Sequence, residues 1–365
     1  MALRRPASIA SKPGLDEYLG RRGVHRLAGA PPSIQVGKNI TATVTLDDGR
    51  RLFLKQGRNR GARDEGALLN EGLFHLCAQE RQLDKTGDSL ARCRYHDREA
   101  DILVFDMLPD TESLAERLER SGELSPATSR DIGSALGTVH AGTADDAREV
   151  TTLGDADSLV PDVLALTPAA YARLSGGEIE LTRLIQGDRP LTDALAALAR
   201  TWQRRCVIHG DLRTENILVP KSANAPATLV DWELARHGDP AGDLGSMMGD
   251  AVRVCVDAVE PSEEAIGHWT RPAVALLDRL RPALRSMWSG YLSTAGQLLH
   301  GRPALPILSV AHAGVFLLHR IAAGGQAYGF LTPRELMYAG VARRLILDPA
   351  SGLKALVPPE EARGA

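Results

Sequence analysis

The 365-residue sequence predicts an α+β fold of two lobes, a small lobe rich in antiparallel β-structure and a larger, mostly helical lobe. Three observations support this prediction. Alternating β-branched runs joined by an Asp-Gly turn lie near the start, and helical apolar spacing dominates the second half. A polar stretch at 207–219 interrupts residues that otherwise resemble buried strands. The length suffices for two domains, and we expect a cleft where the lobes meet.

The small lobe is expected to span residues 1–105. After a polar arm, the runs IQV, TATVTL and RLFLK within residues 34–55 read as strands, and Asp48-Gly49 between the last two favours a hairpin. The segment 66–80 is expected to form a helix, with one buried face made of Leu69, Leu73, Leu76 and Cys77. The apolar run DILVFDML at 101–108 predicts another strand, which leads into a connection at 106–110.

The large lobe is expected to span residues 111–365. Ser125-Pro126 has the pattern of an N-cap followed by a proline in the first helical turn, and apolar residues then recur at helical spacing. A further helix is predicted over 191–205, running directly into the strand at 207. The pattern Thr332-Pro333-Arg334-Glu335 predicts a capping box at the start of a late helix.

Composition restricts the partners and the location of the protein. The net charge is only −3, with 44% hydrophobic and 24% charged residues, which gives no reason to expect nucleic acid or membrane binding. The four cysteines are scattered, so neither a disulfide framework nor a zinc site is indicated, and we expect them in the core. The start lacks an apolar signal segment, and no run of about 18 uncharged apolar residues exists. A cytoplasmic location follows as the default.

The stretch VIHGDLRTENILV at 207–219 gathers the side chains that phosphoryl transfer needs. That reaction requires a base for the acceptor hydroxyl, Mg²⁺, and cations on the phosphates. Asn216 and Asp231 are expected at neighbouring strand ends, where both could bind one ion through oxygen. Asp211 precedes Asn216 by five residues, which allows a short loop to direct its carboxylate at a substrate hydroxyl. The stretch therefore predicts a catalytic loop.

Residues 209–216, HGDLRTEN, resemble the His-Gly-Asp-x-x-x-x-Asn catalytic loop of the aminoglycoside phosphotransferase and choline kinase-like family, which is related to protein kinases. The later segment LVDWELARHGDPAGDLGSM, 229–247, resembles the metal-binding segment of that family. The resemblance covers roughly residues 34–250. It implies a bilobal protein kinase-like fold, with residues 106–110 as the hinge, 207–245 as the catalytic region, and 246–365 as the helices that select the substrate.

The resemblance also assigns roles to individual residues of the catalytic region. Asp211 matches the catalytic base, and Asn216 and Asp231 match the metal ligands. His209 and Asp243 match residues that support the loop.

In the small lobe, the resemblance implies a nucleotide site. Lys55 in LFLK matches the phosphate-binding lysine, and Glu71 matches its partner on the helix, with Glu65 as the competing candidate. Gly37 and Asn39 lie in the hairpin expected to cover the phosphates, although it lacks a Gly-x-Gly-x-x-Gly pattern. The backbone from Asp106 to Leu108 matches the part of the hinge that contacts adenine.

Arg213 and the charge of the large lobe bear on the acceptor. Arg213 follows the base by two residues, where similar Ser/Thr protein kinases carry a lysine, and a cation there can neutralise charge on the transferred group. A structural salt bridge is the alternative for this arginine. Residues 265–334 contain seven arginines and only Asp278 as an acid, a net charge of +6. This charge disfavours a polycationic substrate, although a solvated basic face is equally consistent with it.

The leading hypothesis is an ATP- and Mg²⁺-dependent phosphotransferase that acts on a hydroxyl of a small metabolite or antibiotic. One alternative acceptor is a Ser or Thr side chain in a ribosomally synthesised precursor peptide of a lanthipeptide or thioamitide-type pathway, with a pathway enzyme as a possible partner. A different class of function is a pseudokinase that binds ATP as a scaffold. The complete set of Lys55, Asp211, Asn216 and Asp231 argues against that class.

Overall fold

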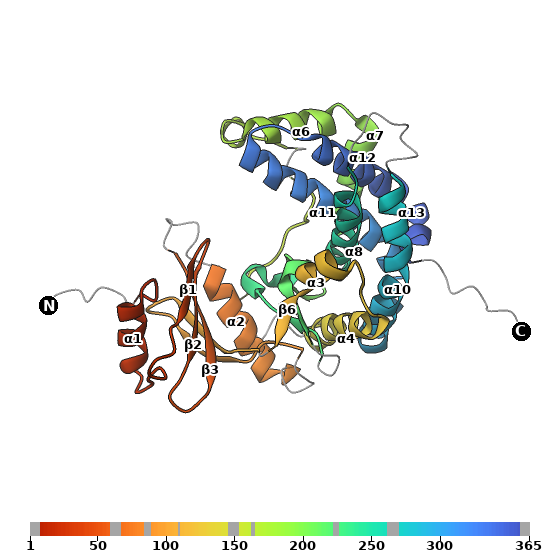
Figure 1. Cartoon of the computed structure of the whole chain (residues 1–365). Coiled ribbons are helices and arrows are strands. Elements are labelled where there is room, and N and C mark those ends of the chain that lie inside the picture. The colour runs from red at the N-terminus through yellow and green to blue at the C-terminus, as the bar shows by residue number, and fades with distance from the viewer. Residues whose placement is uncertain are drawn as a thin grey trace, which may run out of the picture.

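The computed structural model describes residues 8–58, 67–83, 89–108, 110–144, 153–161, 165–221, 226–260 and 270–357. The chain forms the two predicted lobes, with a β-rich N-terminal lobe beside a larger helical lobe (Figure 1). The predicted hinge at 106–110 includes residue 109, which lies outside the described residues.

The N-terminal lobe is built on a five-stranded antiparallel sheet in the order β1-β2-β3-β5-β4. Its strands are β1 (Ser33–Val36), β2 (Ile40–Thr45), β3 (Arg51–Gln56), β4 (Cys93–Asp97) and β5 (Ile102–Asp106). Gly49 has a φ of 84° in the turn between β2 and β3, a conformation that glycine adopts without strain. The Asp-Gly hairpin prediction is therefore confirmed.

Two helices complete this lobe, and both differ from the sequence prediction. The expected polar arm contains α1 (Lys12–Gly20), which is capped by Ser11 and buries Leu15, Tyr18 and Leu19 against the sheet. The predicted second helix is present as α2 (Ala67–Glu80), but its predicted buried face is wrong in part. Leu69 and Leu76 are 38% and 42% exposed.

The inward face of α2 instead carries Leu68, Glu71, Phe74 and Cys77. The glutamate turns inward because a buried lysine pairs with it, and this ion pair outweighs the leucine spacing on which the prediction rested.

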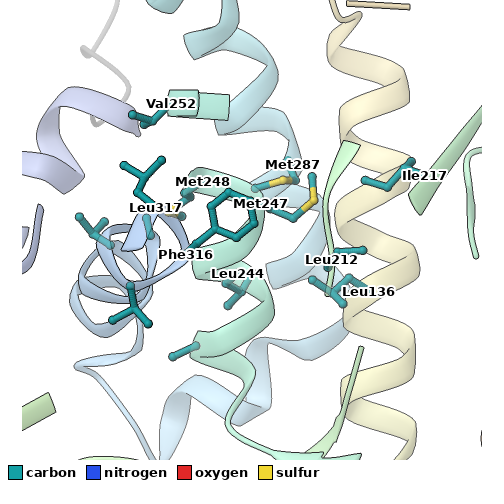
Figure 2. Packing of buried hydrophobic residues seen from close by; sticks show 14 of the residues in the cluster. Leu136, Leu212, Ile217, Leu244, Met247, Met248, Val252, Met287, Phe316 and Leu317 are labelled. Carbon is teal, nitrogen blue, oxygen red and sulfur yellow. The ribbon is translucent and has the colours of Figure 1, made fainter. Parts of the chain in front are cut away.

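The helical lobe packs around one large core. Its main helices are α3 (Leu114–Ser121), α4 (Pro126–Gly142), α5 (Pro168–Tyr171), α6 (Gly176–Gln186), α7 (Arg189–Arg200), α8 (Pro240–Asp257), α10 (Arg271–His300), α11 (Leu305–Tyr328), α12 (Pro333–Leu347) and α13 (Pro349–Leu356). Figure 2 shows Leu244, Met247 and Met248 of α8 packed among apolar side chains of the neighbouring helices. Leu212 and Ile217 join the same cluster, so the predicted catalytic loop rests directly on the core.

Helix ends follow the capping signals closely. Ser125 caps α4, and Thr332 forms the predicted capping box with Glu335 at the start of α12. The helix predicted over 191–205 is wrong in its last five residues, because α7 ends at Arg200. The backbone N–H of Gln203 donates to the buried Asp239 instead of continuing the helix.

Short strands join the helical lobe to the loops of interest. β7 (Cys206–Ile208) pairs with β10 (Arg236–Gly238), and β8 (Ile217–Pro220) lies between β6 (Thr111–Ser113) and β9 (Thr228–Leu229). All four cysteines are free and buried, as expected. By length and composition α11 could cross a membrane, but 67% of its most apolar window is buried inside the fold, where it packs against α8 and α12.

Candidate active site

A cleft of about 790 Å³ lies between the sheet and the loops of the helical lobe. Several predicted site residues line it together, namely Gly37, Asn39, Lys55, Glu71, Asp106, Leu108 and Asp231. Phe53, Phe105 and Met107 add apolar walls near the hinge, which suits a flat aromatic group. The cleft therefore combines an apolar end with a charged end.

Lys55 lies at the charged end of the cleft. It projects from β3 and is only 6% exposed, and its Nζ lies 2.7 Å from Oε2 of Glu71 on α2. The same Nζ forms an ion pair with Asp231 of the helical lobe and lies 3.5 Å from Oε2 of Glu233. Burial lowers the pKa of Lys55, but these carboxylates outweigh it and raise the pKa above the usual value. Lys55 is therefore a cation at neutral pH. The competing candidate Glu65 lies outside the described residues.

Asp243 supports the loop that follows β7. Its Oδ2 accepts hydrogen bonds from the backbone N–H of His209 at 2.6 Å and from Nε2 of His140 at 3.1 Å, and its Oδ1 accepts from Gly210 N at 3.0 Å. Gly210 has a φ of 81°, and a Cβ there would lie 2.6 Å from the carbonyl oxygen of Leu234. Asp243 is fully buried, and although burial alone would raise its pKa, these donors lower it. The turn that presents Asp211 is thus held by a carboxylate from α8.

His209 joins this turn to the segment that carries Asp231. Its Nε2 lies 2.9 Å from the carbonyl oxygen of Val230, and its Nδ1 accepts a hydrogen bond from Asp211 N at 3.4 Å. The ring also packs beside Trp232, with the ring centroids 4.5 Å apart. These contacts give His209 a structural position between the two loops.

Asp211 occupies the tip of the loop, with 35% of its side chain exposed. Nε of Arg213 lies 3.3 Å from Oδ2 of Asp211. Nδ2 of Asn216 donates to the backbone oxygen of Asp211 at 2.8 Å and lies 3.4 Å from Oδ2 of Asp211. Burial raises the pKa of Asp211, and the Arg213 guanidinium opposes that rise. The three predicted residues of the loop therefore lie together.

Asn216 and Asp231 provide donors that fit a magnesium ion. Because Nδ2 of Asn216 faces Asp211, the amide oxygen Oδ1 of Asn216 is the atom left for a metal. Val230 N donates to the backbone oxygen of Asn216 at 3.0 Å, which fixes the two segments side by side, and Asp231 follows with a φ of 67°. An amide oxygen and a carboxylate are the ligand types that Mg²⁺ takes in small number, with water and phosphate completing its shell. Within the described ranges no cluster of three His, Cys, Asp or Glu side chains suits a metal.

An aromatic stack anchors the Asp231 segment to the small lobe. The indole of Trp232 is fully buried and stacks on Phe74 of α2, with the ring centroids 3.7 Å apart and the planes 7° from parallel. The short 3₁₀ turn at Trp232–Leu234 thereby contacts the helix that carries Glu71.

Sequence reasoning did not identify several contacts of this site. Glu233 is 5% exposed, forms an ion pair with Lys38, and accepts from Nδ2 of Asn39 at 3.1 Å. The hairpin between β1 and β2 is thus tied to the segment after Asp231. The identity of Glu233, two residues after the predicted metal ligand, was the only available signal.

A second buried carboxylate also holds the catalytic loop. Oδ2 of Asp250 on α8 accepts from both the backbone N and Oγ1 of Thr214 at 2.7 Å. Arg253, one turn further along the helix, lies 2.5 Å from Asp250 and 3.4 Å from Glu215. No sequence pattern distinguishes this aspartate from a surface residue of the helix.

The seven arginines counted in the helical lobe do not form one basic face. Arg302 is buried, where it forms an ion pair with Asp239 and donates to the carbonyl oxygen of Thr201 at 2.9 Å. Arg281 pairs with Asp278, and Arg334 lies 3.8 Å from Asp257. The charge count therefore overstates the positive potential of this surface.

Comparisons with known proteins identify the family and support the fold. The model of the phosphotransferase enzyme family matches residues 41–285. The structure is similar to that of an ethanolamine kinase from Plasmodium vivax, with a TM-score of 0.52 and 12% identity over 96% of this chain and 91% of that chain. It is also similar to choline kinase from Streptococcus pneumoniae, with a TM-score of 0.50 and 14% identity over 91% of this chain and 97% of that chain. No curated protein sequence matches this chain.

Proposed function

The chain belongs to the phosphotransferase enzyme family, and from this premise we propose that it transfers phosphate from ATP, with Mg²⁺, to a hydroxyl group of a small metabolite or antibiotic. The observation that carries the proposal is the ion pair between Lys55 and Asp231, which joins a phosphate-binding lysine of one lobe to a metal-binding carboxylate of the other. Both groups line the same cleft. The catalytic loop lies beside them, through the backbone bond between Val230 and Asn216.

Each side chain then has a defined task. Lys55 binds the nucleotide phosphates, and Glu71 keeps the lysine extended toward them. The backbone of Asp106 to Leu108 is proposed to bind the adenine, and Gly37 and Asn39 to cover the phosphates.

The acceptor hydroxyl is proposed to lie at Asp211, whose carboxylate orients it and accepts its proton. Asn216 and Asp231 would hold Mg²⁺, which, when bound, stabilises charge on the phosphate oxygens. Arg213 lies close enough to Asp211 to neutralise charge on the group in transfer.

Replacing Asp211 by Asn tests this assignment. We expect turnover to fall by about 10²- to 10⁴-fold, the usual range for a general base, while the affinity for Mg·ATP is retained. Asp278→Asn is the matched control, because Asp278 is an exposed aspartate that pairs only with Arg281 among the described residues. ADP release and mass spectrometry of added phosphate should be followed over a panel of hydroxylated metabolites and antibiotics. Equal turnover by the Asp211 variant and the control would reject the role of Asp211.

A peptide acceptor is the second candidate, and Arg213 favours it because a cation occupies this position in similar protein kinases. In that case the enzyme would phosphorylate Ser or Thr of a precursor peptide and act beside a partner enzyme of the same pathway. Peptides in the same panel decide between the two acceptors. A pseudokinase scaffold would instead show thermal stabilisation by Mg·ATP without transfer to any member. We also propose a cytoplasmic location and an acceptor that is not polycationic.

A further inference from the structure

Within the residues that the structure describes, the guanidinium group of Arg236, close to the catalytic loop, has no hydrogen-bond or ion-pair partner. Its Nε is enclosed by protein, yet it makes no hydrogen bond in the described part of the chain. No ion pair of this side chain occurs there either. The segment around Asp155 borders β10 on the side away from β7. Its carboxylates are already paired, because Asp155 and Asp157 lie 3.2 and 3.0 Å from Arg204. A half-buried cation of this kind is costly unless an anion pairs with it.

The strand register determines which way Arg236 points. Arg236 is opposite Ile208 and Gly238 is opposite Cys206, so these four residues share one face of the strand pair. A Cβ on Gly238 would lie 2.5 Å from Ile208 and 3.2 Å from the ring of Trp202. This face therefore packs toward Trp202.

The same face is covered by α11. The ring of Trp202 contacts that of His312, with centroids 5.4 Å apart. His319 lies seven residues further along α11, which is about two helical turns and hence the same side of the helix. Its Nε2 lies 2.6 Å from the carbonyl oxygen of Leu159.

Arg236 and His319 lie at the end of the strand pair that leads to Asp211. Because β7 and β10 are antiparallel, the chain passes Arg236 as it leaves Ile208 and continues through Gly210 to Asp211. His319 is accessible to solvent, although burial by the surrounding protein lowers its pKa. Asp211 raises the pKa of His319, and Arg236 lowers it. The arginine, the histidine and the catalytic carboxylate thus lie near one another at this end of the strand pair.

We propose that Arg236 binds an anionic group of the acceptor, a carboxylate or a phosphate, and so selects hydroxylated anions as substrates. This inference rests on the proposed function and names the substrate class of the same site. The two terminal nitrogens of the Arg236 guanidinium form a planar donor pair that matches both anions, while Nε is enclosed by protein. His319 stays neutral at physiological pH, and because its Nε2 donates to the carbonyl oxygen of Leu159, its Nδ1 can only accept a hydrogen bond, which leaves the anion to Arg236.

Matched acceptor pairs test the proposal. One pair is 4-hydroxybutanoate with 4-hydroxybutanamide, and the other is glycerol 3-phosphate with glycerol, so the two pairs separate a carboxylate from a phosphate. We expect at least one anionic member to exceed its neutral counterpart in kcat/KM by about tenfold or more, the worth of a charged hydrogen-bonded contact. Arg236→Gln should remove this preference through KM, and Arg236→Lys should retain part of it. Arg271→Gln, which removes an exposed arginine at the start of α10, should leave it unchanged.

Equilibrium titration of the same four compounds into Asp211→Asn protein with Mg·ATP gives a readout that does not need turnover. Loss of anion binding in the Asp211→Asn, Arg236→Gln double variant supports the proposal. Equal binding or turnover of charged and neutral members, or a preference that survives Arg236→Gln, overturns it. Absence of transfer by the wild-type enzyme together with binding that depends on Arg236 would overturn the proposed reaction and leave the anion site standing.

Discussion

Asp243→Asn should separate the positioning of the catalytic loop from the stability of the fold. The carboxylate accepts three hydrogen bonds, two of them from consecutive backbone N–H groups of the loop. An asparagine has one acceptor oxygen. If its amide nitrogen takes the place of Oδ2, it faces the N–H of His209, and if it takes the place of Oδ1, it faces that of Gly210. Either orientation leaves at least one buried donor unsatisfied, and the first also removes the partner of Nε2 of His140. Each unsatisfied donor costs about 1–3 kcal/mol of unfolding free energy.

The effect on turnover should be larger than the effect on stability suggests. Because the two lost or strained bonds belong to the residues just before Asp211, the carboxylate shifts relative to its substrate, and a misplacement of about 1 Å can reduce kcat about 10²-fold. We expect nucleotide affinity to stay close to the wild-type value, since Lys55 and the hinge are unaffected.

Asp239→Asn is the control for this experiment. Asp239 is equally buried and also accepts backbone hydrogen bonds, from Gln203 and Ala241 at 2.9 Å, but it pairs with Arg302 instead of supporting the loop. Breaking that buried pair should cost about 3–5 kcal/mol of unfolding free energy. The free energy of unfolding of both variants should be measured with denaturant. Steady-state turnover should be measured under conditions in which both variants are folded. The reasoning is refuted if the Asp243 variant keeps its kcat, or if the Asp239 variant loses kcat to the same extent.

Two further predictions concern charge at the site. Because burial raises the pKa of Asp211 and the base acts when ionised, turnover should rise as pH increases through that elevated pKa. Arg213 opposes the rise, so Arg213→Gln should move the acidic limb of the profile of kcat/KM against pH to higher pH, and an unmoved limb would contradict this. Asp231→Asn should raise the Mg²⁺ concentration for half-maximal turnover by about 10- to 100-fold. Even the removal of a group that only hydrogen-bonds to a metal ligand reduces metal affinity by this factor. A metal titration that matches the wild type would remove Asp231 from the metal site.

The contacts of the catalytic loop were predictable because they depend on short spacings. Asp211 and Asn216 lie within one turn of chain, and local backbone geometry alone brings Nδ2 of Asn216 to the backbone of Asp211. The hairpin around Gly49 was predictable for the same reason, since its turn requires a residue that tolerates a positive φ.

Contacts set by tertiary packing were not predictable in this way. Leucine spacing placed Leu69 and Leu76 in the core, but α2 is rotated so that Glu71 meets Lys55, and this partner lies on another element. Arg302 was counted with the surface arginines, although a single buried aspartate accounts for it. Neither Arg236 nor Asp250 belongs to a recognisable pattern, because their neighbours come from strands and helices distant in the chain.

The stack of Phe74 on Trp232 makes the placement of α2 resistant to ionic strength. Any outward swing of this helix that separated Glu71 from Lys55 would also have to slide one aromatic ring off another and expose both to water. Salt screens this buried ion pair only weakly and leaves the hydrophobic contact intact. The helix should therefore keep its inward position in concentrated electrolyte, where an arrangement held by exposed charges would loosen.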